Sequence, residues 1–282
     1  MALAIPYNRF SGRFKFSENS EDVRTDIEVQ SNNELNKLSV FFNANKEKFI
    51  FLNLTAFETD IRQRLYFDSS IPTGSGLGSS GAVSAALYDR YRLIHHDDLQ
   101  IIKNNLATIE ACFHGLSSGI DPFISWIKRA VLIENQYTLN SSVDLSPFLK
   151  EYTLYIINSH STGKTRSLVN GFMEHYYQPE FKRIIDEQYV PTINQTINSL
   201  LASDFITFDA SVLKYSQLQL THFQPMINKE MINYFKYGIE SREFILKICG
   251  SGGGGFILGI SNQPLKAEAY FNLNHLDYTV VY

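Results

Sequence analysis

The sequence contains few cysteines, little imbalance of charge and no long apolar run. Its two cysteines, Cys112 and Cys249, are too few for a metal cluster or a disulfide scaffold, which favours a reducing cytoplasm. A formal net charge of -4 makes a nucleic-acid or anionic-membrane partner a poor expectation. No apolar run approaches transmembrane length, and residues 1–6 are too short for a signal peptide. We therefore expect a cytoplasmic protein without a membrane or nucleic-acid partner.

Apolar and aromatic residues, in contrast, are plentiful. They include 21 Phe and 16 Tyr among 282 residues, enough for one large domain or for two domains that share a cleft. Short β-branched or aromatic segments between polar turns predict strands in the first part of the chain. These strands are expected at residues 26–29, 38–42, 49–52 and 64–67.

Helical periodicity begins after residue 82, where Val83, Leu87 and Tyr91 share one face. A second helix is expected at about 98–114, with Gly115 as its C-terminal stop. A polar, helix-rich stretch is expected from about 164 to 243. Further strands are predicted at 130–133, 153–157, 244–249, 256–258 and 278–281. Because strands and helices do not alternate as regular βαβ units, the pattern predicts an α+β fold.

A glycine-rich loop at residues 72–80, Pro-Thr-Gly-Ser-Gly-Leu-Gly-Ser-Ser, precedes the first predicted helix. Its backbone N–H groups, at the positive end of a helix dipole, are suited to phosphate, and Ser79 and Ser80 add hydroxyl groups for a cap or for a phosphate-bound Mg²⁺. The alternative is a flexible turn with Ser79 as a simple N-cap. No Lys follows the glycines, which excludes a Walker A loop, and Ser79 stands where a dinucleotide fingerprint has its third glycine.

A second glycine-rich loop, residues 250–255, has five glycines in six positions between two apolar strands. Glycine costs backbone entropy on folding, so an ordinary hairpin rarely needs so many. A flexible linker is the alternative, but the flanking strands are too apolar for one. We therefore expect this loop to lie close to a ligand or to the first loop.

The two loops, in this order, resemble the second and third motifs of the GHMP kinases. Residues 72–82 are similar to Pro-x-x-x-Gly-Leu-Gly-Ser-Ser-(Ala/Gly), and residues 247–254 to Lys-x-(Ser/Thr/Cys)-Gly-(Ala/Ser)-Gly-Gly-Gly. Within this superfamily, residues 110–121 resemble the mevalonate kinases, in which a helical Glu precedes His-Gly-x-x-Ser-Gly-(Ile/Val)-Asp. Residues 161–169 resemble the family's Thr-(Lys/Arg)-x-Leu-Val loop beside the substrate.

The resemblance implies the two-domain GHMP kinase fold. Residues 1–148 would form a ribosomal protein S5 domain 2-like, ATP-binding domain, and residues 149–282 a ferredoxin-like domain. It also implies transfer of a phosphoryl group from ATP, with Mg²⁺, to a small alcohol. Mevalonate, in isoprenoid synthesis, is the expected acceptor. The alternatives are another GHMP kinase acting on phosphomevalonate, homoserine or a sugar, a decarboxylase on the same scaffold, and a non-catalytic nucleotide- or metabolite-binding homologue. Dimers are common in the superfamily, so a homodimer is compatible with it.

The resemblance also carries roles onto matching positions. Asp121 is the expected catalytic base, and Ser80 and Glu110 the expected Mg²⁺ ligands. The expected nucleotide-binding residues are Gly74, Ser75, Gly76, Leu77, Gly78, Ser79, Ser80, Gly252 and Gly253. The expected substrate-side residues are His114, Ser118, Gly119 and Thr165, with His114 structural rather than catalytic. Without the resemblance, Glu110 would be interpreted as a solvated helix residue and Asp121 as a turn residue before Pro122.

The chain departs from the family at its start. Family members begin with a strand that carries Lys and continues into Gly-Glu-(His/Tyr), and they reach Gly-x-x-Ala-Leu-Ala only afterwards. Residues 1–6, Met-Ala-Leu-Ala-Ile-Pro, resemble the stretch after that first motif. The first strand and its Lys are therefore expected to be missing, through a truncated or misassigned start or a reduced protein. An unpaired sheet edge is expected where that strand would lie, and the activity of a chain without this Lys is an open question.

Overall fold

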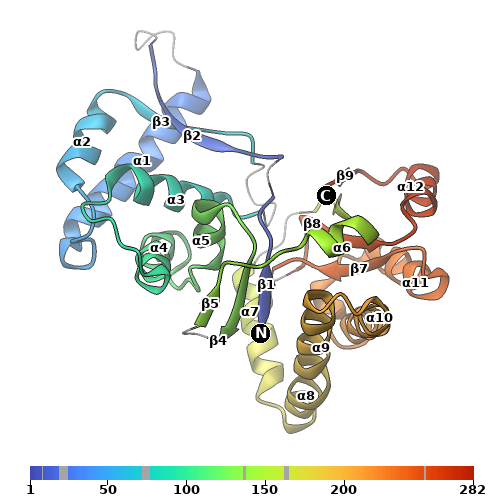
Figure 1. Ribbon diagram of the computed structural model, residues 1–282. Coiled ribbons are helices and arrows are strands. Elements are labelled where there is room, and N and C mark those ends of the chain that lie inside the picture. The colour runs from blue at the N-terminus through green and yellow to red at the C-terminus, as the bar shows by residue number, and fades with distance from the viewer. Residues whose placement is uncertain (8, 19–24, 72–76, 136–137, 162–164, 251) are drawn as a thin grey trace.

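The computed structural model describes residues 1–7, 9–18, 25–71, 77–135, 138–161, 165–250 and 252–282 (Figure 1). Helices and two small antiparallel sheets form the N-terminal half, in which β2 pairs with β3 and the second sheet has the order β1-β4-β5. The elements are β1 (Ala2–Ala4), β2 (Gly12–Phe16), α1 (Asp26–Ala44), η2 (Lys46–Lys48), α2 (Leu54–Arg62), β3 (Leu65–Ser69), α3 (Ser79–Tyr91), α4 (Leu99–His114), α5 (Ile120–Ile127), β4 (Val131–Asn135) and β5 (Thr138–Asn140).

The C-terminal half is built on a four-stranded antiparallel sheet of order β7-β8-β6-β9. Its elements are α6 (Ser146–Glu151), β6 (Thr153–Asn158), α7 (Thr165–Tyr176), α8 (Pro179–Ile184), the π-turn η3 (Ile185–Tyr189), α9 (Val190–Leu201), α10 (Phe205–His222), the short turns η4 (Gln224–Met226) and η5 (Lys229–Met231), α11 (Ile232–Ser241), β7 (Ile245–Ile248), β8 (Phe256–Ser261), α12 (Pro264–Leu273) and β9 (Tyr278–Val280). The predicted α+β character and the helix-rich stretch are confirmed.

Both faces of this sheet are covered, because successive side chains of a strand point to opposite faces. Leu154 and Ile245 enter a core that they share with Phe208 of α10. Their neighbours Tyr155 and Leu246 enter a separate core on the other face. The first of these cores also includes Ala130 and Leu145, so its packing continues across position 148/149. The domain boundary expected there from the sequence stays a prediction.

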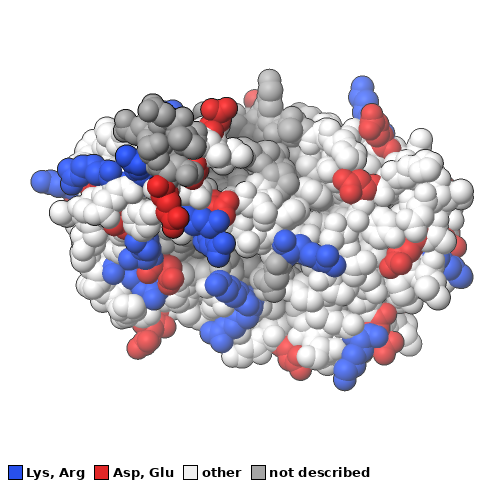
Figure 2. Space-filling view, turned by 90° about the horizontal axis from the view of Figure 1, so that it is seen from above, with Lys and Arg blue, Asp and Glu red and all other residues white. Residues whose placement is uncertain are grey.

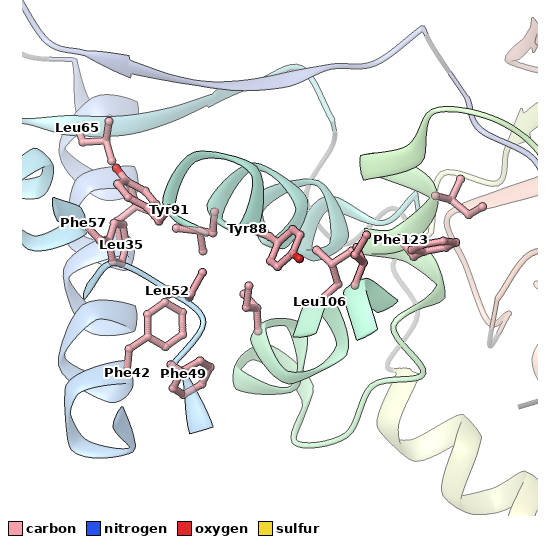
Figure 3. Close-up of a cluster of buried hydrophobic side chains, with 14 of the residues drawn as sticks. Leu35, Phe42, Phe49, Leu52, Phe57, Leu65, Tyr88, Tyr91, Leu106 and Phe123 are labelled. Carbon is pink, nitrogen blue, oxygen red and sulfur yellow. The ribbon is translucent and has the colours of Figure 1, made fainter. Parts of the chain in front are cut away.

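The N-terminal half has its own aromatic core, shown in Figure 3. Phe42 of α1 lies between Phe49, at a ring-centroid distance of 4.4 Å, and Phe57 of α2, at 5.9 Å. Leu106 of α4 and Phe123 of α5 close the opposite end of this core. Truncation of a buried Phe to Ala typically costs about 3–5 kcal/mol. This core therefore fixes the positions of α3, α4 and α5, which all contribute to it.

The chain's single tryptophan, Trp126, joins α5 to α3. Its indole N–H donates to Asp89 Oδ1 at 3.3 Å, and its ring meets Tyr88 edge-on at 6.2 Å. The guanidinium of Arg92 lies 5.6 Å from the indole centroid, within the range of a cation–π contact. α3 and α5 are therefore fixed to one another away from their first turns.

The prediction of strands at 26–29 and 38–42 is wrong, because these residues form the 19-residue helix α1. A capping box starts the helix: the Thr25 hydroxyl accepts from Glu28 N–H at 3.3 Å, and the Glu28 carboxylate accepts from Thr25 N–H at 2.8 Å. The strand predicted at 49–52 is also wrong, since only Leu52 pairs, in an isolated bridge with Arg92. The other predicted strands correspond to β3, β4, β6, β7, β8 and β9.

One face of the molecule carries charges of both signs. On the face shown in Figure 2, Lys and Arg side chains are scattered among Asp and Glu side chains rather than gathered into one basic patch. Within the described residues, no helix combines the length and the apolar character that a membrane span requires.

Candidate active site

Two helices, α3 and α5, begin in the same unusual way. Each follows a glycine in the left-handed region, Gly78 with φ 71° and Gly119 with φ 72°, a conformation that glycine adopts at no steric cost. A glycine has no side chain to bind the first amide groups of the helix, whereas Thr25 caps α1 and Asp98 caps α4 in this way. The first turn of α3 thus keeps the amide groups and the positive dipole end that suit an anion.

The first turn of α3 and the first turn of α5 lie against one another at Gly81. A Cβ atom on Gly81 would lie 2.9 Å from both the carbonyl carbon of Asp121 and the nitrogen of Pro122. A Cβ on Gly78 would lie 3.5 Å from the Cβ of Asp121. The exposed Asp121, the predicted base, therefore stands directly beside the start of α3.

Glu110, on α4, places a buried carboxylate behind this junction. Its side chain is only 5% exposed. Ser80 Oγ donates to its Oε1 at 3.2 Å, and Ser117 Oγ donates a short hydrogen bond to its Oε2. A buried carboxylate needs such partners, because desolvation otherwise makes its charge costly. The structure thus brings together Ser80 and Glu110, the two predicted Mg²⁺ ligands, although 30 positions separate them in the chain.

The donor chemistry of this pair fits Mg²⁺, which prefers oxygen ligands and usually takes only one or two carboxylates from a protein. Within the described residues, no group of three or more His, Cys, Asp and Glu side chains is arranged to hold a metal ion. The remaining ligands of a Mg²⁺ ion bound at Ser80 and Glu110 would therefore be phosphate oxygens and water.

The segment between α4 and α5 contains the other predicted substrate-side residues. Gly119 packs tightly on α4, since a Cβ there would lie 2.6 Å from the carbonyl oxygen of Lys103 and 2.8 Å from the Cβ of Ala107. Ser118 is exposed, and its Oγ accepts only a long bond from Ile120 N–H at 3.4 Å. Gly119 therefore has a packing role, whereas Ser118 is open to the surface.

Several predicted residues are placed only in part. Gly74, Ser75 and Gly76 lie outside the described residues. His114 is the last residue of α4 and Thr165 the first of α7, and only these backbone positions are described.

The second glycine-rich loop makes its described contacts with residues of the C-terminal half. Gly252 N–H donates to the carbonyl oxygen of Cys249 at 3.1 Å and Gly253 N–H to that of Met226 at 2.6 Å. A Cβ on Gly252 would collide with the Met226 carbonyl oxygen, and one on Gly253 with the Leu168 side chain. The two predicted nucleotide-binding glycines thus bond to protein carbonyls and pack against the C-terminal half.

Both cysteines are unreactive in character. Burial raises the pKa of the Cys112 thiol to about 11, and burial also raises the pKa of Cys249. A thiol rather than a thiolate therefore predominates at neutral pH, so neither residue is a candidate nucleophile.

The class of protein follows from this fold and site. Residues 46–129, which include α3, Glu110 and Asp121, match the family model for the GHMP kinases N terminal domain. A phosphomevalonate kinase from Streptococcus pneumoniae, solved with phosphomevalonate and AMPPNP, superposes with a TM-score of 0.62 at 13% identity and covers 96% of this chain and 89% of that one. Residues 46–129 thus resemble the GHMP kinase N-terminal domain, and the chain has the GHMP kinase fold.

Mevalonate kinases are among the relatives that this chain resembles in sequence. The enzyme of Pyrococcus abyssi is 25% identical over 203 residues, which cover 68% of this chain and 58% of that protein. The L. major mevalonate kinase, solved with R-mevalonate, superposes with a TM-score of 0.55 at 16% identity, over 74% of this chain and 65% of that one. The matches confirm the resemblance inferred from the sequence, and they span less than two thirds of the curated relatives' length.

Proposed function

We propose that this chain transfers the γ-phosphoryl group of ATP to the hydroxyl group of a small alcohol, with mevalonate as the favoured acceptor. The observation that carries the proposal is the convergence of Ser80, Glu110 and Asp121 at the first turn of α3. The names of the sequence relatives favour mevalonate within this class.

Phosphoryl transfer depends on positioning and on neutralisation of charge more than on covalent chemistry. The first turn of α3 offers amide groups and a positive dipole end to the phosphates. Ser80 and Glu110 would hold Mg²⁺, which supplies neutralisation of the charge on the phosphate oxygens. Because Gly81 has no side chain, α5 can lie close to α3. This closeness brings the proposed phosphate-binding residues next to Asp121.

Asp121 is the residue placed to accept the proton of the acceptor hydroxyl. As the acceptor's O–H bond breaks, its oxygen forms the new bond to phosphorus, the bond to ADP breaks, and the proton goes to the carboxylate. Asp121 lies in the first turn of α5, where the helix dipole favours a negative charge. Its exposure leaves room for an alcohol beside it.

A second acceptor, phosphomevalonate, is favoured by the superposition over 96% of this chain with a phosphomevalonate kinase. Homoserine and sugars are further acceptors for this fold class. A non-catalytic nucleotide-binding role is the alternative from another class, and the paired Ser80 and Glu110 with the adjacent Asp121 speak against it, because binding alone needs no base.

The decisive experiment is a coupled ADP-release assay with ATP and Mg²⁺, run with mevalonate, phosphomevalonate, homoserine and galactose. Asp121→Asn should lower turnover by about 10²–10⁴-fold, the usual contribution of a positioned base, while ATP affinity is retained. Asp144→Asn is the matched control, because Asp144 also lies exposed near a helix start but outside the site. Undiminished turnover in Asp121→Asn would rule out this assignment. Bound ATP with no ADP release for any acceptor would favour the non-catalytic alternative.

A further inference from the structure

Ser117 is absent from the residues that the sequence pattern selects, yet it joins two elements of the candidate site. Its Oγ donates to Glu110 Oε2 on α4 and accepts from the N–H of Gly119, which precedes α5, at 2.9 Å. We propose that Ser117 is a positioning residue that fixes the Glu110 carboxylate for Mg²⁺ and ties it to the start of the helix that carries Asp121. This inference rests on the proposed function.

The two oxygens of Glu110 have different partners. Oε1 accepts from Ser80, the other proposed metal ligand, whereas Oε2 accepts from Ser117. Ser80 donates to the same carboxylate with which it would share a metal ion, so its hydrogen bond competes with metal binding. The bond from Ser117 is on the other oxygen and does not compete. Ser117 therefore keeps the carboxylate from rotating and leaves Oε1 on the side of Ser80.

The backbone fixes the position of the Ser117 hydroxyl. Gly119, whose N–H binds that hydroxyl, is pressed against Lys103 and Ala107 of α4. Lys103, Ala107 and Glu110 lie three or four residues apart, so they share one face of this helix. Residues 115–119, which connect α4 to α5, are thus held against the face of α4 that carries Glu110.

The neighbouring serine does not have this arrangement. Ser118 is exposed, and its Oγ accepts a long hydrogen bond of 3.4 Å from Ile120 N–H within its own turn. Of the two adjacent serines, the structure therefore assigns the contact with the carboxylate to Ser117 and leaves Ser118 facing the surface.

The test is calorimetric titration of AMPPNP into wild type and variants, in Mg²⁺ and again in EDTA. Ser117→Ala should weaken binding in Mg²⁺ by about 10-fold, the usual loss when a residue that orients a metal ligand is removed, and change binding in EDTA by less than about twofold. Ser117→Thr keeps the hydroxyl and should restore the affinity in Mg²⁺. Ser241→Ala is the matched control, because Ser241 Oγ likewise accepts from the N–H two residues on, that of Glu243, at 3.2 Å.

Equal affinities of wild type and Ser117→Ala in Mg²⁺ would overturn the inference, as would an equal loss in Mg²⁺ and EDTA. If Ser117→Ala does not fold, Ser117→Cys, which has nearly the same shape and a weak donor, should show the same Mg²⁺-dependent loss. A wild type that binds no nucleotide in either condition would refute the proposed function, and the role of Ser117 with it. A wild type whose binding depends on Mg²⁺, beside an unaffected Ser117→Ala, would refute only the role of Ser117.

Discussion

The two glycine-rich loops look alike in sequence but use their glycines differently. At the first, Gly78 of the loop and Gly81 in the first turn of α3 let the start of α3 approach Asp121 and Pro122 at the start of α5. In the second, Gly252 and Gly253 make hydrogen bonds and close contacts within the C-terminal half.

The two loops differ in what surrounds their glycines. What distinguishes the first loop is the helix that follows it, whose first turn lies beside a buried, paired carboxylate and an exposed one. The second loop is bordered by strands β7 and β8, which offer no helix dipole to an anion. The role of each glycine therefore depends on its neighbours, and substitutions at single glycines can separate the two roles.

The largest effect is expected at Gly81, in the first turn of the helix that follows the first loop. Gly81→Ala places a methyl group against the backbone of Asp121 and Pro122, so α3 and α5 must move apart. A displacement of about 1 Å can cost about 100-fold in rate, and we expect turnover to fall by that factor. The ADP-release assay measures it, and circular dichroism reports whether the fold is kept. Turnover at the wild-type level would show that contact between α3 and α5 is not needed.

The reactivity of Cys112 tests how firmly the helix behind the first loop is packed. Burial raises its thiol pKa to about 11 from the model-compound value of 9.0. Because a raised pKa favours the protonated form, the reactive thiolate should be about 100-fold scarcer at pH 8 than for a free cysteine. Alkylation by iodoacetamide, followed by mass spectrometry, should be slow in the native state, faster as the pH approaches 11, and rapid in urea. Rapid native alkylation at pH 8 would contradict the raised pKa of the Cys112 thiol.

At the second loop the expected effect is on stability. Gly253→Ala combines a left-handed φ of 78° with a collision against Leu168, and should lower the free energy of unfolding by about 2 kcal/mol. Gly250→Ala is the control, because φ is 55° but, in the described part of the chain, no atom lies within 4 Å of the added methyl group; a loss of about 1 kcal/mol is expected. Urea denaturation measures both. A selective loss of ATP affinity in Gly253→Ala would instead support the nucleotide-binding role inferred from the sequence.

The smallest effect is expected at a glycine of a third kind. Gly171 lies inside α7, and no atom of the described residues lies within 4 Å of a Cβ atom there. Gly171→Ala should stabilise the protein by about 0.5–1 kcal/mol, because alanine is the better helix former. A higher midpoint of urea denaturation checks this expectation. Destabilisation by Gly171→Ala would mean that the added methyl group collides with another part of the protein.

The sequence predicted elements well where local pattern and tertiary packing agree. The apolar stripe of α4 is an example: Ile102, Leu106 and Ile109 recur at helical spacing, and all three are buried. Gly115 ends that helix as expected, with φ 84°. The prediction failed at α1, because β-branched and aromatic residues such as Ile27, Val29 and Phe41 were taken to favour strands.

The signals for α1 were nevertheless present in the sequence. Thr25 and Glu28 have the spacing of a capping box, and Leu35, Ser39 and Phe42 recur every three or four residues on the buried face. Ile27 and Val40 are largely exposed, at 72% and 67%, so their apolar character says nothing about burial.

The site was predictable only where a motif spans the distance. The resemblance paired Ser80 with Glu110, and their side chains meet. Ser117 escaped prediction because the pair Ser117 and Ser118 gives no local sign of which hydroxyl turns towards α4. In the structure the choice is set by tertiary contacts, namely the bond from Gly119 N–H to Ser117 Oγ and the packing of Gly119 on α4.

The placement of Trp126 gives this protein a built-in optical reporter. As the chain's one tryptophan, it accounts alone for the indole fluorescence, and it bonds α5 to Asp89 of α3. The proposed site lies at the other end of the same two helices. A ligand that changes the angle between them would alter the hydrogen bond and the neighbouring Arg92 charge, and so shift the emission maximum. Binding of the proposed nucleotide and alcohol would then be measurable in real time without attaching a dye.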